Sequence, residues 1–374
     1  IDEQSIAAVG PWPWSWEVIA DLVDKINEAG AQLQIHDILY PAGERAYDTR
    51  LLASLTEQER SIIAQLPILQ SQSERLQTGT LTHSASGISC QVSEGVGQFP
   101  QAFSFIGPSN LFSSVPKGHI APIIDSDGAV RRIPAMVCVD GNAFPALALA
   151  PFFQLVGMQS WQSEVRTGLG IFSPDQILTF DSYPGLEVPL DREGAMRISF
   201  RKSPTAFRSI SAVDILNGNF EENILDNVLV LVGATAFGLD DIVPTPYSGY
   251  SPGVELQARL LSSVLDQDVP FAPSGKGIIG IIVSVLLALV CFHMAFRRGR
   301  YAMLGLPLMA VLSPFLAIGL HGLVLVNYGL WIGWITTALF GSIVSSILLI
   351  FEHARVRVER FRVVQNLTSY LPVE

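Results

Sequence analysis

The chain has 374 residues, 49% of them hydrophobic, and a formal net charge of −11. Three of its 34 Asp and Glu residues, but eight of its 23 Lys and Arg residues, lie after residue 272, so the first 272 residues are more acidic than the whole. This charge argues against nucleic-acid binding, which needs a basic patch to neutralise phosphates. The first 272 residues are also enough for a sizeable core in one or two domains.

The cysteines give little information about metals or redox chemistry. They are Cys90, Cys138 and Cys291, and no C-x-x-C pair with metal-ligand spacing is present. Cys90 and Cys138 could form a disulfide in an oxidising compartment, or they could be buried free thiols. The sequence leaves both possibilities open.

The N-terminal region has a strand, helix and strand pattern. The apolar run at 5–9 ends at Gly10-Pro11-Trp12-Pro13-Trp14, which is typical of a buried strand and its turn. Residues 16–29 have apolar side chains at helical spacing, and residues 32–39 predict a second strand. Together these segments predict a βαβ unit with a parallel strand pair.

Residues further along the chain continue an α/β pattern. Residues 48–66 predict an amphipathic helix, and residues 144–156 predict another. Strands at 119–124 and 130–139 flank Asp125-Ser126-Asp127-Gly128. This string predicts a hairpin turn rather than a calcium loop, because its twelfth position carries no acidic side chain.

The last part before the apolar block completes the predicted domain. The Gly-, Pro- and Ser-rich stretch at 159–195 gives no readable elements. Residues 211–216 predict a short helix capped by Ser211. The continuous Val and Leu run at 228–232 is typical of a central strand covered on both faces, and residues 253–266 predict a helix. Residues 1–272 are therefore expected to form an α/β domain with a mixed, largely parallel sheet and flanking helices.

Three apolar runs follow this domain. They occupy 277–296, 301–325 and 330–351, and each has close to the roughly 20 residues that cross a hydrocarbon core. A soluble core helix would be shorter and would show a polar face. We therefore predict three transmembrane helices, followed by a juxtamembrane signalling helix and linker at 352–374.

The arginines predict the orientation of these helices. They occur between the first and second runs and again after the third run, at Arg297, Arg298, Arg300, Arg355, Arg357, Arg360 and Arg362. Cytoplasmic loops carry the Lys and Arg excess, so the C-terminus is expected in the cytoplasm and residues 1–272 outside it. The sequence begins directly with a segment typical of a folded domain and ends abruptly, and export of residues 1–272 requires a signal, so we expect a signal or span upstream and a further domain downstream.

The segment after the third run has a possible dimer seam. Ala354, Val358, Phe361 and Gln365 approximate the a and d positions of a short parallel coiled coil. This pattern predicts a homodimer formed through the spans and the C-terminal helix. A solvated juxtamembrane helix is the alternative.

No catalytic residues and no metal ligands are predicted. The chain has no H-E-x-x-H, phosphate-binding lysine loop or nucleophile elbow. It does offer a candidate ligand crevice, because ligands of open α/β sheets bind beyond the carboxyl ends of the strands. The side chains expected there are Trp12, Trp14, Asp37, Thr235, Asp240 and Asp241. Alternatively, the tryptophans pack structurally and the aspartates cap turns.

Several motifs carry a resemblance to a known family. They are Gly10-Pro11-Trp12-Pro13-Trp14, His36-Asp37-Ile38-Leu39, Gly118-His119-Ile120, Asp127-Gly128-Ala129-Val130-Arg131-Arg132, Val232-Gly233-Ala234-Thr235 and Pro252-Gly253-Val254-Glu255. With these motifs the chain resembles the second type of CHASE domain, an extracellular sensor followed by three transmembrane helices in bacterial receptor adenylate cyclases and histidine kinases. Gln257 departs from the His that the family resemblance leads us to expect.

The resemblance implies a function for the whole protein. The protein would lie in the bacterial plasma membrane, with membrane lipid around its spans. Its ectodomain would sense a small ligand or an envelope protein. The tail at 361–374 resembles the linker before a class III adenylate cyclase, which would use ATP with Mg²⁺ or Mn²⁺. The alternatives are the receptor part of a histidine kinase and a non-enzymatic membrane subunit that binds envelope proteins.

Overall fold

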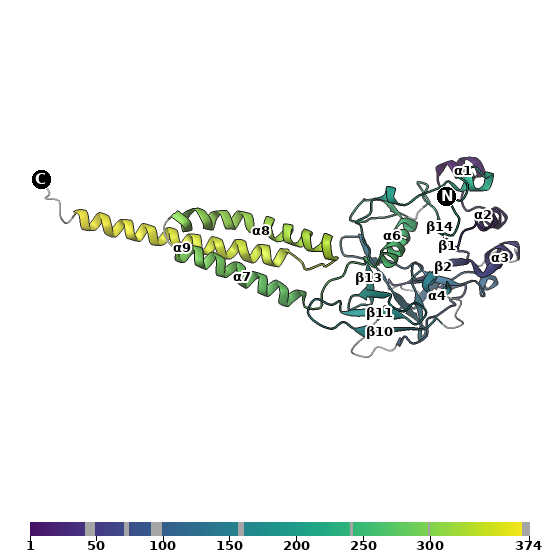
Figure 1. Ribbon diagram of the computed structural model, residues 1–374, viewed down its shortest axis with the longest axis horizontal. Coiled ribbons are helices and arrows are strands. Elements are labelled where there is room, and N and C mark those ends of the chain that lie inside the picture. Colours follow the sequence, from purple (N-terminus) through teal and green to yellow (C-terminus); the bar gives the residue numbers. More distant parts are fainter. Residues whose placement is uncertain are drawn as a thin grey trace. The chain divides into compact units, whose positions relative to one another are not determined.

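The computed structural model describes residues 1–41, 49–70, 75–90, 99–155, 161–239, 242–297 and 300–368. Contacts divide the chain into two compact units. The first comprises Ile1–Gly168 and Pro174–Phe271, and the second comprises Leu169–Ser173 and Ala272–Glu374. Figure 1 shows the elements of both.

The first element is a helix, so the strand predicted at 5–9 is wrong. Helix α1 (Glu3–Val9) is capped by Asp2, whose carboxylate accepts hydrogen bonds from the backbone N of Ser5 at 3.0 Å and from its Oγ at 2.6 Å. This carboxylate satisfies a free backbone donor of the first turn, which favours the helix over a strand. The predicted βαβ unit therefore lacks its first strand.

The next two elements form as predicted. Helix α2 (Trp16–Glu28) begins at Ser15, whose Oγ accepts a hydrogen bond from Val18 N. It leads into strand β1 (Leu33–Asp37), which is buried along most of its length.

Strand β1 lies between two parallel neighbours that come from opposite ends of the domain. It pairs with β14 (Leu229–Gly233) on one side and with β2 (Ser61–Ile68) on the other. The order of the main sheet is β14-β1-β2-β4-β3, with β5 beside β2. Pairs β2–β5 and β3–β4 are parallel and β2–β4 is antiparallel. The predicted mixed, largely parallel sheet is confirmed, but β14 is the last strand in this order and not a central one.

The helix predicted at 48–66 is correct only in its first half. Helix α3 (Thr49–Thr56) is followed by Gln58 and Glu59, whose φ angles are 55° and 54°. Residues in this left-handed region end a right-handed helix. The apolar residues after them belong to strand β2 instead.

Thirteen further strands are described, and several of them pair as hairpins. These strands are β3 (Gln77–Thr78), β4 (Ser104–Ile106), β5 (Lys117–His119), β6 (Ile123–Ile124), β7 (Val130–Pro134), β8 (Met136–Val139), β9 (Asn142–Pro145), β10 (Ser163–Thr167), β11 (Gln176–Phe180), β12 (Glu187–Leu190), β13 (Ala195–Arg197), β15 (Ile242–Val243) and β16 (Ser251–Pro252). The turn predicted at 125–128 joins the antiparallel strands β6 and β7, as expected. Strands β10, β11 and β12 form an antiparallel sheet in the stretch that gave no readable pattern.

The shorter helices differ in part from the predictions. They are α4 (Ala150–Gln154), α5 (Ala212–Asn217), and the 3₁₀ turns η1 (Glu57–Glu59), η2 (Asn110–Phe112) and η3 (Pro204–Ala206). The helix predicted at 144–156 is therefore reduced to α4, because residues 142–145 pair as β9. Ser211 does not cap α5 with its side chain. Instead, Ser5 Oγ accepts from Val213 N at 3.1 Å, and Ser211 Oγ donates to Asp2 at 2.7 Å.

The main sheet is covered on both faces. One face packs against α6 (Gly253–Leu265), the predicted C-terminal helix of the domain, and the other packs against α2 and α3 (Figure 1). Alternation along β1 divides the two cores, since Leu33 and Ile35 lie in the α6 core. This arrangement gives a two-sided α/β sandwich.

The second unit contains the apolar helices. Among the described residues, three helices are long and apolar enough to span a membrane: α7 (Lys276–Phe296), α8 (Arg300–Tyr328) and α9 (Ile335–Thr368). The prediction of three apolar C-terminal helices is confirmed. Helix α9 continues without a break from the third apolar run to Thr368, through most of the segment at 352–374 that was predicted as a juxtamembrane signalling helix and linker.

Small residues allow these helices to pack closely. A Cβ at Gly341 of α9 would lie 2.4 Å from Leu287 Cδ2 of α7 and 3.0 Å from Ser313 Cβ of α8. Ser342 Oγ lies 3.2 Å from Ser313 Oγ and donates to Ala310 O at 3.1 Å. Small residues and hydroxyl hydrogen bonds are typical of helix packing in membranes.

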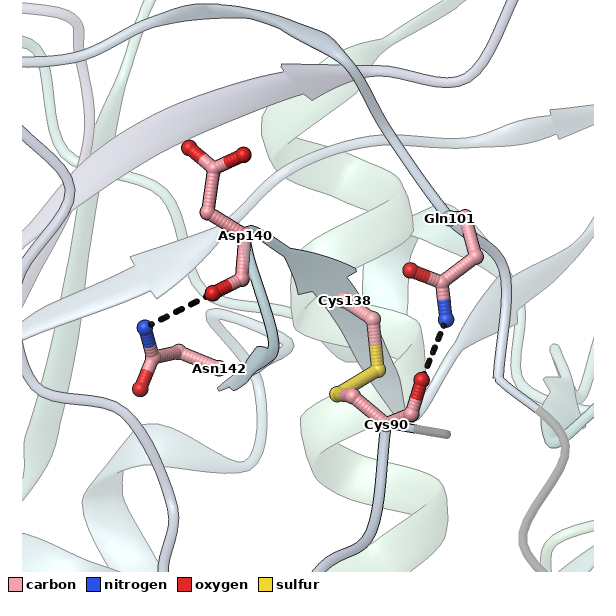
Figure 2. The surroundings of a disulfide bond; sticks show 5 residues. All are labelled: Cys90, Gln101, Cys138, Asp140 and Asn142. Carbon is pink, nitrogen blue, oxygen red and sulfur yellow. Dashed lines mark hydrogen bonds between the residues drawn. A yellow bond between two sulfur atoms is a disulfide. The ribbon is translucent and has the colours of Figure 1, made fainter. Parts of the chain in front are cut away.

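Cys90 and Cys138 form a disulfide with a Cα–Cα distance of 5.7 Å. Figure 2 shows it beside the tight turn that carries Asp140 and Asn142. Gln101 Nε2 donates to the carbonyl of Cys90 at 3.1 Å, and Cys138 is fully buried in β8. The disulfide thus links the segment before β8 to the core, which decides between the two alternatives that the sequence left open.

Removing this disulfide should destabilise the first unit. The two cysteines are 48 residues apart, and closing a loop of that length is worth at most about 4 kcal/mol in the chain-entropy picture. We expect the Cys90→Ser/Cys138→Ser variant to lose about 2–4 kcal/mol of unfolding free energy, measured by urea denaturation of the full chain in nanodiscs. The control is Cys291→Ala, which should leave the effect of a reductant on stability unchanged. Equal urea midpoints for the double variant and the unmodified chain would contradict this prediction.

Candidate functional site at the carboxyl edge of the sheet

The carboxyl ends of β1 and β14 meet at a point where the chain leaves the sheet in two directions. Asp37 and Gly233 are paired at the ends of these strands. After β1 the chain reaches α3 on one face of the sheet, and after β14 it reaches α6 on the opposite face. In open α/β sheets, such a switch between neighbouring strands opens a crevice where ligands bind.

The structure places the predicted site residues in different surroundings. Trp14 is buried in the α2 core and donates its indole N–H to Gly10 O at 2.9 Å, which fits structural packing. Trp12 is half-buried and packs edge-to-face against Trp14 at 5.8 Å between ring centroids. Asp37 is half-buried at the end of β1, and Thr235 is exposed just after β14. The remaining two, Asp240 and Asp241, lie outside the described residues.

A small pocket lies beside Thr235. Its volume is about 200 Å³, and it is lined by Glu3, Ala234, Thr235, Ala236, Phe237, Leu239, Ile242, Tyr250 and Pro252. Thr235 is the one predicted and described site residue among this lining. Sequence reasoning missed Glu3 and Tyr250, because they come from the helix at the start of the chain and the turn before β16.

Glu3 holds the loop that forms this pocket. Its Oε1 accepts a hydrogen bond from Phe237 N at 3.0 Å, and this bond lowers the pKa of the Glu3 carboxyl. The rings of Phe237 and Tyr250 are 86% and 79% exposed. A carboxylate beside accessible aromatic rings favours a positively charged organic group.

A larger pocket lies elsewhere on the first unit. It has a volume of about 500 Å³ and is mainly apolar, with a lining of Leu69, Gln70, Phe99, Pro100, Pro122, Ile123, Ile124 and Glu193. No motif in the sequence indicated it, because its lining comes from separate loops and a short strand. It lacks the position at the end of β1 and β14 that marks the smaller pocket.

Buried polar side chains lie on the α3 side of strands β1, β2 and β5. His36 of β1 is paired with Ile63 of β2, which is paired with Lys117 of β5, so the three side chains share one face. Lys117 Nζ donates to Thr82 Oγ1 and Phe112 O, both at 2.6 Å, and to Val115 O at 3.0 Å. These neutral acceptors compensate in part for burying the amine.

Burial changes the protonation of these groups. It lowers the pKa of Lys117 to about 7. It also lowers the pKa values of His36 and His119 to about 3. His36 Nδ1 lies 3.1 Å from the hydroxyl of Tyr40, whose own pKa is raised by burial. Both histidines are therefore neutral at pH 7 and act as packing and hydrogen-bonding groups.

Stability should depend on pH in two windows. At His36, His119 and Lys117 the folded state binds fewer protons than the unfolded state, because burial lowers each pKa. The free energy of unfolding therefore falls as the pH falls from the side chain's pKa in the unfolded state to its pKa in the folded state. We expect a fall from pH 6.5 towards 3 because of His36 and His119, and another from pH 10.5 to about 7 because of Lys117. Each group contributes at most about 1.4 kcal/mol per pH unit.

The Lys117→Met variant tests the second window by removing the amine that titrates there. It should lose the dependence above pH 7 and keep the one below pH 6.5, as measured by urea denaturation of the full chain from pH 5 to 9.5. Arg201→Met, at an exposed ion pair with Asp268, is a matched control that should keep both windows. An unchanged slope above pH 7 in Lys117→Met would show that this lysine does not titrate there.

The end of β14 requires glycine for close packing. A Cβ at Gly233 would lie 2.5 Å from Val254 Cβ in α6, whereas a Cβ at Gly249 would meet no atom within 4 Å. Gly233→Ala should therefore push α6 from the strand and cost about 1–3 kcal/mol of stability. Gly249→Ala should have little effect. Urea denaturation of both variants checks this, and equal stabilities would contradict it.

Comparison with known proteins identifies a family. The family model described as the CHASE2 domain matches residues 1–290. Comparison with curated proteins finds no match, and neither does comparison with solved structures. The matched range covers most of the chain, including the crevice at β1 and β14.

Proposed function

Because the chain belongs to the CHASE2 domain family and continues into three apolar helices, it is a membrane protein of the signalling-receptor type, and we propose that it is the sensory and transmembrane part of a bacterial receptor adenylate cyclase. In this proposal residues 1–272 lie on the extracytoplasmic side of the bacterial plasma membrane and bind a small ligand in the crevice. The C-terminus lies inside and controls a downstream class III cyclase domain that uses ATP with Mg²⁺ or Mn²⁺.

The orientation has support from two independent observations. The arginines flank the membrane helices on the side of the α7–α8 connection and the C-terminus, as expected for the cytoplasmic side. The Cys90–Cys138 disulfide lies within residues 1–272, the part assigned to the extracytoplasmic side. Disulfides persist in oxidising compartments, which fits that side.

The ligand crevice has support from topology and from chemistry. It lies at the paired carboxyl ends of β1 and β14, beyond which the chain continues to opposite faces of the sheet, and Thr235, Glu3 and Tyr250 line its pocket. The pocket volume of about 200 Å³ suits a ligand smaller than a typical drug molecule. Glu3 and the exposed rings favour a small organic cation over an anion. An envelope protein remains the alternative partner on this surface.

The observation that carries the proposal is the continuity of α9. This helix runs from Ile335 to Thr368, and its charged part contains Arg355, Glu359 and further arginines. A continuous helix transmits rotation and translation of its membrane part to its end. A ligand can drive such a change only by its different affinity for the two states.

A homodimer would give α9 a partner. On the charged part of this helix, Val358 and Phe361 are 52% and 63% exposed, and both lie on the predicted seam with Ala354 and Gln365. Pairing with α9 of a second copy would cover these side chains.

Insertions into α9 test the proposal. Each inserted residue rotates the downstream helix by about 100°, and seven residues return it to within about 20°. We expect insertion of one or two alanines after Glu359 to change adenylate cyclase activity several-fold in membranes that contain the full-length protein. Insertion of a seven-residue helical block should restore it.

The control outcomes separate the alternatives. Equal cyclase activity in all insertion variants would overturn signalling through α9. Absence of cyclase activity in every variant would reject the cyclase. In that case, ATP-dependent histidine phosphorylation in the same membranes would support the kinase, and its absence the non-enzymatic subunit.

A further inference from the structure

The loop that joins β10 to β11 is bonded to the residues just before α7, within the second unit. The loop is Leu169–Ser173, between β10 and β11, and it belongs to the same compact unit as α7. Ser274 N donates to Ser173 O at 2.8 Å, Ser274 Oγ donates to Gly170 O at 3.0 Å, and Gly275 N donates to Ile171 O at 3.1 Å. The loop is thus held against the two residues that precede α7.

The packing at this junction is tight. A Cβ on Gly275 would lie 2.6 Å from Ile171 Cβ and 2.7 Å from Ile171 O. Glycine therefore permits the loop backbone to approach the chain at the entry to the helix. By contrast, a Cβ on Gly277, in the first turn of α7, would meet no atom within 4 Å.

The side chains of this loop are apolar and exposed. Leu169 is 89% exposed, Ile171 is 42% exposed and Phe172 is 60% exposed. Three such side chains in a five-residue loop make an apolar patch that water does not favour. In the first turns of α7, the helix that follows the residues bonded to this loop, Ile278 and Ile281 are also more than half exposed.

The length of α7 determines the depth of this loop. The helix has 21 residues, so it is about 31 Å long, which matches a hydrocarbon core of about 30 Å. Its first residue, Lys276, therefore lies at the edge of the core, where a lysine side chain can reach the lipid headgroups. Ser274, Gly275 and the loop bonded to them lie in the interfacial layer.

We propose that Leu169, Ile171 and Phe172 form a membrane anchor that inserts into the interfacial layer of the lipid bilayer beside the start of α7. The occupant of the patch is lipid, because the loop is bonded to Ser274 and Gly275, which lie at the membrane surface directly before α7. The apolar side chains would reach about 5–10 Å into the boundary between headgroups and acyl chains. The anchor would connect the β10–β11 hairpin directly to the bilayer.

Site-directed spin labelling tests the anchor in the full chain. In a Cys291→Ala background, Phe172→Cys carries a nitroxide label, with the protein reconstituted in phosphatidylethanolamine and phosphatidylglycerol bilayers. Without reductant, the Cys90–Cys138 disulfide stays unlabelled. We expect the label to be accessible to oxygen and protected from a water-soluble nickel chelate. The matched control is Phe103→Cys, at a phenylalanine that is 69% exposed, and its label should be accessible to the chelate.

A second pair of variants tests the link to α7. Gly275→Val should displace the loop and expose the label at position 172 to the nickel chelate, whereas Gly277→Val should leave it protected. Access of the chelate to position 172 in the unmodified background would overturn the proposal. Protection that Gly275→Val does not change would indicate a protein contact and would overturn it too.

Discussion

The fold of the first unit depends on the pairing of β1 with β14. These five-residue strands are paired in parallel from Leu33 with Leu229 to Asp37 with Gly233, although they come from opposite ends of the domain. Their alternate side chains separate the α6 core from the α2 and α3 core. Next to this pair, α1 is bonded to the loop after β14, since Thr235 N donates to Ile1 O and Phe237 N donates to Glu3. The pairing therefore forms the edge of the sheet at which the crevice lies, and the α1 contacts shape the pocket beside it.

The membrane unit follows a different constraint. Lipid offers no hydrogen-bond partners, so the backbone must satisfy its own donors and acceptors within helices. Side chains then adjust the packing, as Gly341 and the Ser313–Ser342 pair do between α9 and its neighbours. Helix α9 extends to Thr368, well past residue 351, where the third apolar run ends.

The sequence predicted these two parts with unequal success. The apolar helices were predictable because length and hydropathy are local properties, and family motifs indicated the sensor domain. The run at 5–9 was misread because a short apolar segment fits a strand or a helix, and here the Asp2 cap decides. Similarly, Ile62 and Ile63 fit the apolar face of the helix predicted at 48–66, but two residues with positive φ end the helix before it reaches them.

The candidate site was predictable only in outline. The carboxyl edge of β1 and β14 followed from the strand pattern, and Thr235 lies on the pocket there. The burial of Trp14, and the approach of Glu3 and Tyr250 to the pocket, depend on tertiary packing between distant segments that no local pattern encodes. For the same reason the pairing of Cys90 with Cys138 could not be chosen over free thiols.

The distance along the chain between β1 and β14 also has a consequence for biogenesis. At a synthesis rate of about 5–20 residues per second, β1 exists for about 10–40 s before its partner is made. During this time one edge of a buried strand has no neighbour, and unpaired edges recruit other strands. Helix α7 begins shortly after α6, so the ribosome delivers this apolar helix soon after the sheet can close. Closure of the sheet and synthesis of α7 are therefore nearly simultaneous events, and a delay in closure leaves an adhesive strand edge exposed while α7 is being made.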